Sequence, residues 1–206
     1  MVVAGYLGSL GSSRGPEMRN AAIAITTCWL VALPSFALAD RVAGEKKAEL
    51  CLLCHGAVEG KPFVPNLDGQ PTTYFIAQIT AYKTGKRTDA VMNTNAASLG
   101  ADDVQDIADF FASRKSGPYS VFDSERASSG TKKLSELPCR SCHGSDYSGN
   151  GPVARLAGQS PRYTAWQLQS MRSGKRLHPT SDGGDAVKTL TDDDINNVAH
   201  ALASLN

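Results

Sequence analysis

The sequence predicts an all-α protein in which two small helical domains follow one another and share one pattern. The residues after position 55 recur, in the same order and with almost the same spacing, after position 143. Apolar residues near the end of each copy return every three or four positions, which is the period of a helix. No stretch shows the alternation of apolar and polar residues that a half-buried strand needs.

The first 39 residues have the pattern of an export signal. Arg14 and Arg19 precede an uncharged stretch over residues 21–38, and the cleavage-site pattern Ala-Leu-Ala lies at 37–39. Met18 offers a second, more compact start for the same signal. No later segment approaches the roughly 20 apolar residues that a transmembrane helix needs. We therefore expect residues 1–39 to be removed and the mature protein to lie in the periplasm without a transmembrane segment.

Residues 40–115 form the first expected domain. A helix over 41–50 should precede the motif Cys-x-x-Cys-His, and a second should run over 72–83 until Gly85 stops it. A third helix over 99–113 carries a regular apolar face and closes the domain.

A linker over residues 116–122 separates the first domain from the second, because its Ser-Gly-Pro sequence breaks any helix. The second domain, 123–206, should repeat the same order of helices, over 125–137, 161–172 and 190–204. Thr191 and Asp194 have the spacing of a capping box, which marks the start of the last helix.

The motif Cys-x-x-Cys-His occurs at 51–55 and again at 139–143. Two thiols at this spacing can add to the vinyl groups of one haem, and the next residue then offers an imidazole to its iron. A shared zinc site is disfavoured because each motif lies in its own complete repeat, and a thioredoxin-like pair needs a βαβ unit. The sequence thus predicts two covalent haem c groups, attached through Cys51, Cys54, Cys139 and Cys142, with His55 and His143 as iron ligands.

The ligand on the far side of each iron decides what that iron can do. A methionine opposite histidine raises the reduction potential and closes the iron to substrates. Met92 lies in the expected loop between Gly85 and the closing helix, from which it could reach the far face of the first haem. We therefore predict Met92 as the second ligand of the first iron.

The second repeat has no methionine in the corresponding loop, 177–188, where Gly183 takes the place of Met92. The favoured ligand of the second iron is His178, which would lower its potential. Met171 is an alternative, although its place within a helix suits packing better. The iron could also be open to a small ligand, and Lys188 is a remote further choice.

Charge narrows the possible partners. The whole chain has a formal net charge of +1, and residues 1–39 also carry +1, so the mature chain is neutral before haem is added. This balance argues against a nucleic-acid binder. Arg87 and Arg176 occupy matching places after the middle helices, where they could pair with haem propionates or lie in solvent.

Over residues 40–206 the chain resembles the dihaem cytochrome c4 family. Its two haem motifs, the repeated frame Leu-x-Gly-Gln, Tyr-x-x-x-Gln and Gly-Lys-Arg, and the doubled closing helix carry this resemblance. The resemblance implies two tandem class I cytochrome c domains whose haems face one another across a pseudo-twofold interface. It also implies histidine–methionine ligation of both irons, a pattern that this chain keeps at Met92 and lacks in its second repeat.

The function that follows is the transfer of single electrons between periplasmic redox proteins, without catalysis of its own. The expected partners are a respiratory complex, a terminal oxidase or a dehydrogenase, and peripheral association with the membrane stays open. One alternative is a dihaem enzyme or sensor whose open second haem binds a small ligand. Another is the cytochrome subunit of a larger periplasmic dehydrogenase.

Overall fold

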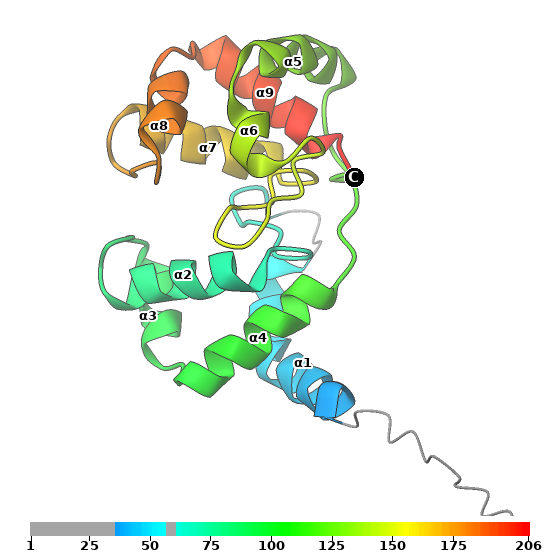
Figure 1. Ribbon diagram of the computed structural model, residues 1–206, viewed down its shortest axis with the longest axis vertical. Coiled ribbons are helices and arrows are strands. Elements are labelled where there is room, and N and C mark those ends of the chain that lie inside the picture. The colour runs from blue at the N-terminus through cyan, green and yellow to red at the C-terminus, as the bar shows by residue number, and fades with distance from the viewer. Residues whose placement is uncertain (1–35, 57–60) are drawn as a thin grey trace, which may run out of the picture. The chain divides into compact units, whose positions relative to one another are not determined.

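A computed structural model describes residues 36–56 and 61–206, and the side chains from residue 43 onward within these ranges (Figure 1). The part described is helical, with one isolated β-bridge between Asn150 and Val153 and no strand. None of its helices combines the length and the apolar character needed to cross a membrane. The predicted all-α class is confirmed, whereas most of the predicted export signal, residues 1–35, lies outside the described residues.

The described residues of the first repeat form four helices: α1 (Phe36–His55), α2 (Thr72–Lys83), α3 (Ala90–Ala97) and α4 (Ala101–Ser113). Helix α1 is longer than predicted and runs through the first haem motif. It packs against α4, and their shared core includes the fully buried Ile107 and Phe111. Helix α3 corrects the prediction of a loop around Met92. It begins because the Asp89 carboxylate accepts hydrogen bonds from the free backbone N–H groups of Val91 and Met92, at 3.1 and 2.9 Å.

The second repeat contains five helices: α5 (Ser124–Glu136), α6 (Cys139–His143), α7 (Pro161–Arg172), α8 (Ser181–Lys188) and α9 (Asp192–Ala203). Helix α8 lies where a loop was predicted, as α3 does in the first repeat, and Thr180 caps it. Helix α5 packs closely on α9, as α1 packs on α4. The two repeats therefore share their order of helices as well as their sequence pattern.

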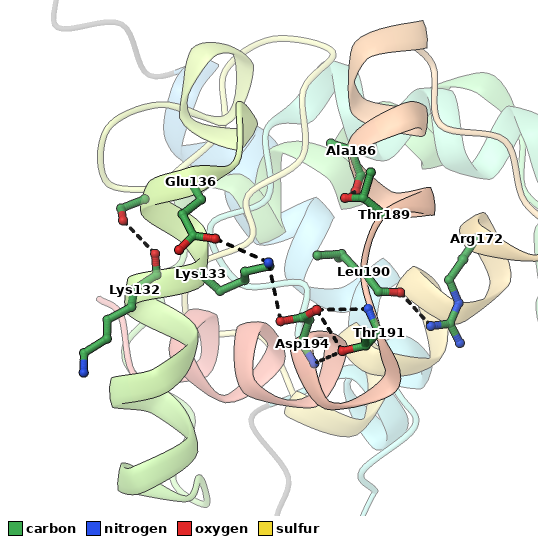
Figure 2. Close-up of polar contacts among 10 residues, drawn as sticks. Lys132, Lys133, Glu136, Arg172, Ala186, Thr189, Leu190, Thr191 and Asp194 are labelled. Atoms are coloured by element: carbon green, nitrogen blue, oxygen red, sulfur yellow. Dashed lines mark hydrogen bonds and ion pairs between the residues drawn. The ribbon is translucent and has the colours of Figure 1, made fainter.

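The start of α9 shows how sequence signals set a helix boundary (Figure 2). The Asp194 carboxylate accepts hydrogen bonds from the backbone N–H and the hydroxyl of Thr191, at 3.0 and 2.8 Å, and the Thr191 hydroxyl accepts one from the Asp194 N–H. The predicted capping box is confirmed. Lys133 of α5 lies 3.6 Å from Asp194, and Arg172 of α7 donates to the Leu190 carbonyl at 2.8 Å. The cap thus joins three helices.

The repeats pack into one compact unit through the glutamines of their shared frame. The Gln159 side chain accepts from the Asn66 N–H at 2.7 Å and donates to the Asn66 carbonyl at 2.9 Å. The Gln70 side chain makes the equivalent pair with the backbone of Arg155, at 3.1 and 2.8 Å. Both glutamines are about 95 % buried, at 5 % and 6 % exposure. Each repeat therefore satisfies a buried amide of the other.

Candidate haem sites

The first haem motif occupies the last turn of α1. Cys51 and His55 are half-buried and Cys54 is exposed, and both cysteines are free thiols. The His55 Nδ1 lies 3.0 Å from the Pro65 carbonyl oxygen. Because a carbonyl can only accept, Nδ1 carries the proton and Nε2 keeps its lone pair for a metal. Burial lowers the pKa of His55, which favours this neutral form.

The second haem motif forms the short helix α6 and reproduces the first. Cys139 and His143 are half-buried, Cys142 is exposed, and both thiols are free. The His143 Nδ1 lies 2.8 Å from the carbonyl oxygen of Ala154, the residue that matches Pro65 in the repeat. Burial lowers the pKa of His143 as well. Both imidazoles are therefore oriented in the way that metal-binding histidines are.

Two residues were predicted as distal ligands: His178 lies beside His143, and Met92 packs against the same core as Cys51. Met92 is half-buried on α3 and packs against the core of the first repeat. The His178 ring approaches the His143 ring, with 6.3 Å between the centroids and 64° between the planes. Met171 and Lys188, the alternatives in the second repeat, line a cavity of about 440 Å³ together with His178.

Arg87 and Arg176 cross from one repeat to the other, which corrects the option that they lie in solvent. Arg87 donates to Gln78 of its own repeat at 2.8 Å and to Tyr163 and Gln167 of the other at 2.9 and 3.2 Å. Arg176 reciprocates with its own Gln167 and with Tyr74 and Gln78, the latter two at 3.2 and 3.3 Å. Among the described residues neither guanidinium has a carboxylate within 4 Å, so two partly buried positive charges remain without a counter-charge.

The described residues fit haem c. The group needs two thiols and an imidazole on one side, and each repeat offers them on adjoining turns. Its propionates need cationic donors, and Arg87 and Arg176 have no carboxylate within 4 Å among the described side chains. The buried Arg155 Nη2 also has no hydrogen-bond partner in the described part of the chain. An anionic group beside Arg155 would satisfy this buried nitrogen, which is otherwise costly to leave unpaired.

Sequence reasoning missed the roles of Arg155, Gln70 and Gln159. The glutamines recur at matching positions, which was a usable signal, but a repeat does not reveal which atoms meet across it. His200 accepts a hydrogen bond from the Asp123 N–H at 2.8 Å and so holds the start of α5. Trp166 is 42 % exposed and packs edge-on against Tyr163.

Comparisons with known proteins find relatives among the c-type cytochromes. The family model "Cytochrome c" matches residues 129–206. Cytochrome c4 of Pseudomonas aeruginosa is 36 % identical over 161 residues, which span 73 % of this chain and 79 % of the relative. A protein of Stutzerimonas stutzeri named "Thiosulfate dehydrogenase electron acceptor" is 28 % identical, over 77 % of this chain and 80 % of that protein. The crystal structure of reduced cytochrome c4 from Pseudomonas stutzeri superposes with a TM-score of 0.71 at 29 % identity, over 81 % of this chain and 98 % of that one.

The fold and its paired sites define a c-type cytochrome with two haems that transfers electrons. The two tandem class I cytochrome c domains that the family resemblance implies are confirmed by the likeness to a solved cytochrome c4. The chain belongs to the cytochrome c4 family.

Proposed function

We propose that this cytochrome is a periplasmic carrier that takes single electrons from a dehydrogenase and passes them to a respiratory acceptor. Its haems are attached at Cys51 and Cys54 and at Cys139 and Cys142, within domains that span residues 40–115 and 123–206. His55 and His143 would each bind one iron, and Met92 would supply the other ligand of the first iron. Haem iron held in this way changes by one electron between its ferric and ferrous states.

The observation that carries this proposal is the identical setting of the two proximal histidines. In each repeat, Nδ1 is tied to a backbone carbonyl and Nε2 is left with its lone pair, beside two free thiols. The protein's task in such a site is to fix the ligands and keep the imidazoles neutral. Burial performs the second part, because it disfavours the imidazolium.

The arginine pair supports a carrier that works as one body. Arg87 and Arg176 each bind a tyrosine and a glutamine of the opposite repeat. We propose that both also balance haem propionates, which would give these cations the negative partners that the described side chains do not provide. Electrons would then pass between two haem sites that Arg87 and Arg176 connect.

A dehydrogenase is the preferred electron donor because two relatives are named as electron acceptors of thiosulfate dehydrogenase. Periplasmic location follows from the predicted export signal. Peripheral contact with the membrane is compatible with this role.

The test begins with the protein matured in a host that attaches haem c. Mass spectrometry should show two haems and an N-terminus at Asp40, with the protein in the periplasmic fraction. Replacing Cys139 and Cys142 by alanine should remove one haem and leave the other. Stopped-flow absorbance should then show that thiosulfate dehydrogenase, supplied with thiosulfate, reduces the wild-type cytochrome at least as fast as the dehydrogenase turns over. Stoichiometric haem with no reduction by this donor would contradict the proposed partner, and a single haem would contradict the proposed sites.

A further inference from the structure

We propose that His178 is the second axial ligand of the iron in the second repeat, opposite His143. The cytochrome would then carry one histidine–methionine haem and one bis-histidine haem. This inference rests on the proposed attachment of haem at Cys139 and Cys142. It departs from the histidine–methionine pattern at both irons that the resemblance to the family implies.

The separation of the two rings matches a pair of imidazoles on one metal ion. First-row metals bind imidazole nitrogen at about 2 Å, and the centroid lies about 1 Å beyond that nitrogen, so two opposed rings have centroids about 6 Å apart. The rings of His143 and His178 are 6.3 Å apart. Their planes differ by 64°, which is compatible with two imidazoles twisted about a common axis. The same separation and angle are those of an edge-to-face contact between the two rings.

Thr180 orients the His178 ring for this role. The His178 Nδ1 lies 3.2 Å from the Thr180 carbonyl oxygen, 3.2 Å from its hydroxyl and 3.3 Å from its backbone nitrogen. The Thr180 N–H donates to Nδ1 in the tautomer that carries its proton on Nε2. The other tautomer donates from Nδ1 to the Thr180 carbonyl and leaves Nε2 as the ligand atom, as at His143, and binding of iron would select it. Thr180 also caps α8, so one residue fixes both the helix and the ring.

Gly183 explains how a residue from before α8 can replace a methionine from within the helix. Gly183 occupies the place that Met92 holds in the first repeat. A Cβ atom on Gly183 would lie 2.6 Å from the His178 Nε2 and closer still to two other ring atoms. The absence of a side chain at 183 therefore makes the space that the imidazole fills.

The competing ligands fit the structure less well. The Lys188 ammonium is bound to the Asp185 carboxylate at 2.9 Å, so ligation would cost that ion pair and a proton. Met171 belongs to α7, whereas the ligand in the first repeat comes from the segment that follows the matching helix, α2. An open iron would require the His178 ring to leave the position in which it already lies.

Ligation by His178 would make the two haems unequal. Methionine opposite histidine raises the potential of a haem, and a second histidine lacks this effect. We therefore expect the first haem to accept an electron before the second. In the half-reduced protein the electron would reside mainly in the first repeat.

Electron paramagnetic resonance of the fully oxidised protein tests the assignment. The wild type should show two low-spin haems, and its absorption spectrum should contain the red methionine-to-iron band of one haem. His178→Ala should convert one of the two haems to high spin, and added imidazole should restore it. His178→Met should double the methionine band and bring the two reduction potentials closer together.

Two glycine variants provide a matched control. Gly183→Ala should weaken the second low-spin signal, because the new methyl group would displace the His178 ring. Gly184→Ala adds the same group to the next residue of α8, where it would meet only the His178 Cβ at an ordinary 3.8 Å, and should change nothing. Met171→Leu should also leave both haems low-spin.

Several results would overturn the inference. A high-spin haem in the wild type would mean an open iron, and two unchanged low-spin haems in His178→Ala would mean another ligand. Loss of the second low-spin signal in Met171→Leu would assign that ligand to Met171. A protein without haem at Cys139 and Cys142 would instead refute the proposed site itself, and mass spectrometry separates that case from the others.

Discussion

The close contact of α5 with α9 gives a quantitative prediction at Gly130. This buried glycine lies on α5 at its crossing with α9. A Cβ atom at 130 would lie 2.8 Å from the Val198 nitrogen and closer still to the Asn197 carbonyl group. These are backbone atoms within a helix, so they cannot rotate aside as a side chain could. Gly130→Ala must therefore push the two helices apart.

Two opposing effects set the expected magnitude. Overpacking a close-packed site costs about 1–3 kcal/mol. Alanine within a helix recovers about 1 kcal/mol relative to glycine. Since the obstacle is backbone, we expect the upper part of the overpacking range and a net loss of about 1–2 kcal/mol. Because the two repeats form one compact unit over Pro34–Asn206, such a loss lowers the melting temperature by about 2–8 °C.

Thermal unfolding of the oxidised, haem-loaded protein, followed by circular dichroism, measures this loss. Ser129→Ala is the matched control, because Ser129 is the exposed neighbour of Gly130 on α5. It gains helix propensity without a clash and should melt at or slightly above the wild-type temperature. If Gly130→Ala melted with the control rather than below it, the contact between the helices would not be as tight as the structure shows.

Three further predictions concern the interface between the repeats, the first iron and acid stability. Arg87→Gln should lower the free energy of unfolding by about 1–3 kcal/mol in a urea titration, because it removes hydrogen bonds to Tyr163 and Gln167; an unchanged midpoint would contradict the bonds between the repeats. Met92→Ala should abolish the methionine band and yield one high-spin haem, and a retained band would exclude Met92 as the ligand. Hydrogen bonds from Thr191 lower the pKa of Asp194, so its stabilisation is full at neutral pH and lost as the pH falls below the ordinary range for aspartate. Asp194→Asn should therefore show a smaller loss of melting temperature between pH 6 and 3 than the wild type, and equal losses would count against this capping contact.

The sequence was informative where one signal dominated. Helices α2 and α7 begin and end at the predicted residues because a glycine follows each of them, with φ of 71° at Gly85 and 75° at Gly174. The closing helices agree to within two residues, since their apolar faces are regular. Helix α3 was missed because it has no periodic apolar face, and α8 was missed because it is short and contains two adjacent glycines. Capping by Asp89 and Thr180 starts them, and a cap becomes decisive only once the neighbouring structure is in place.

The sites divide in the same way. The haem motifs could be read directly, because the chemistry requires a fixed spacing of thiols and imidazole. The contacts of Gln70 and Gln159 could not, because each is satisfied by backbone atoms more than 80 residues away. Repetition showed that these positions match, but their reciprocal pairing depends on how two copies face one another.

The symmetry of the frame bears directly on what makes the two haems different. The glutamine pairs and the arginine pair make equivalent contacts in both repeats. Each proximal histidine also contacts a backbone carbonyl at the matching position of its own repeat. Influences shared by both sites shift both potentials together and leave their difference small. A change of distal ligand acts on one iron alone. With Met92 as the distal ligand in the first repeat and His178 in the second, this one difference in ligand sets the order in which the two haems are reduced. His178→Met should therefore largely remove the difference between their potentials.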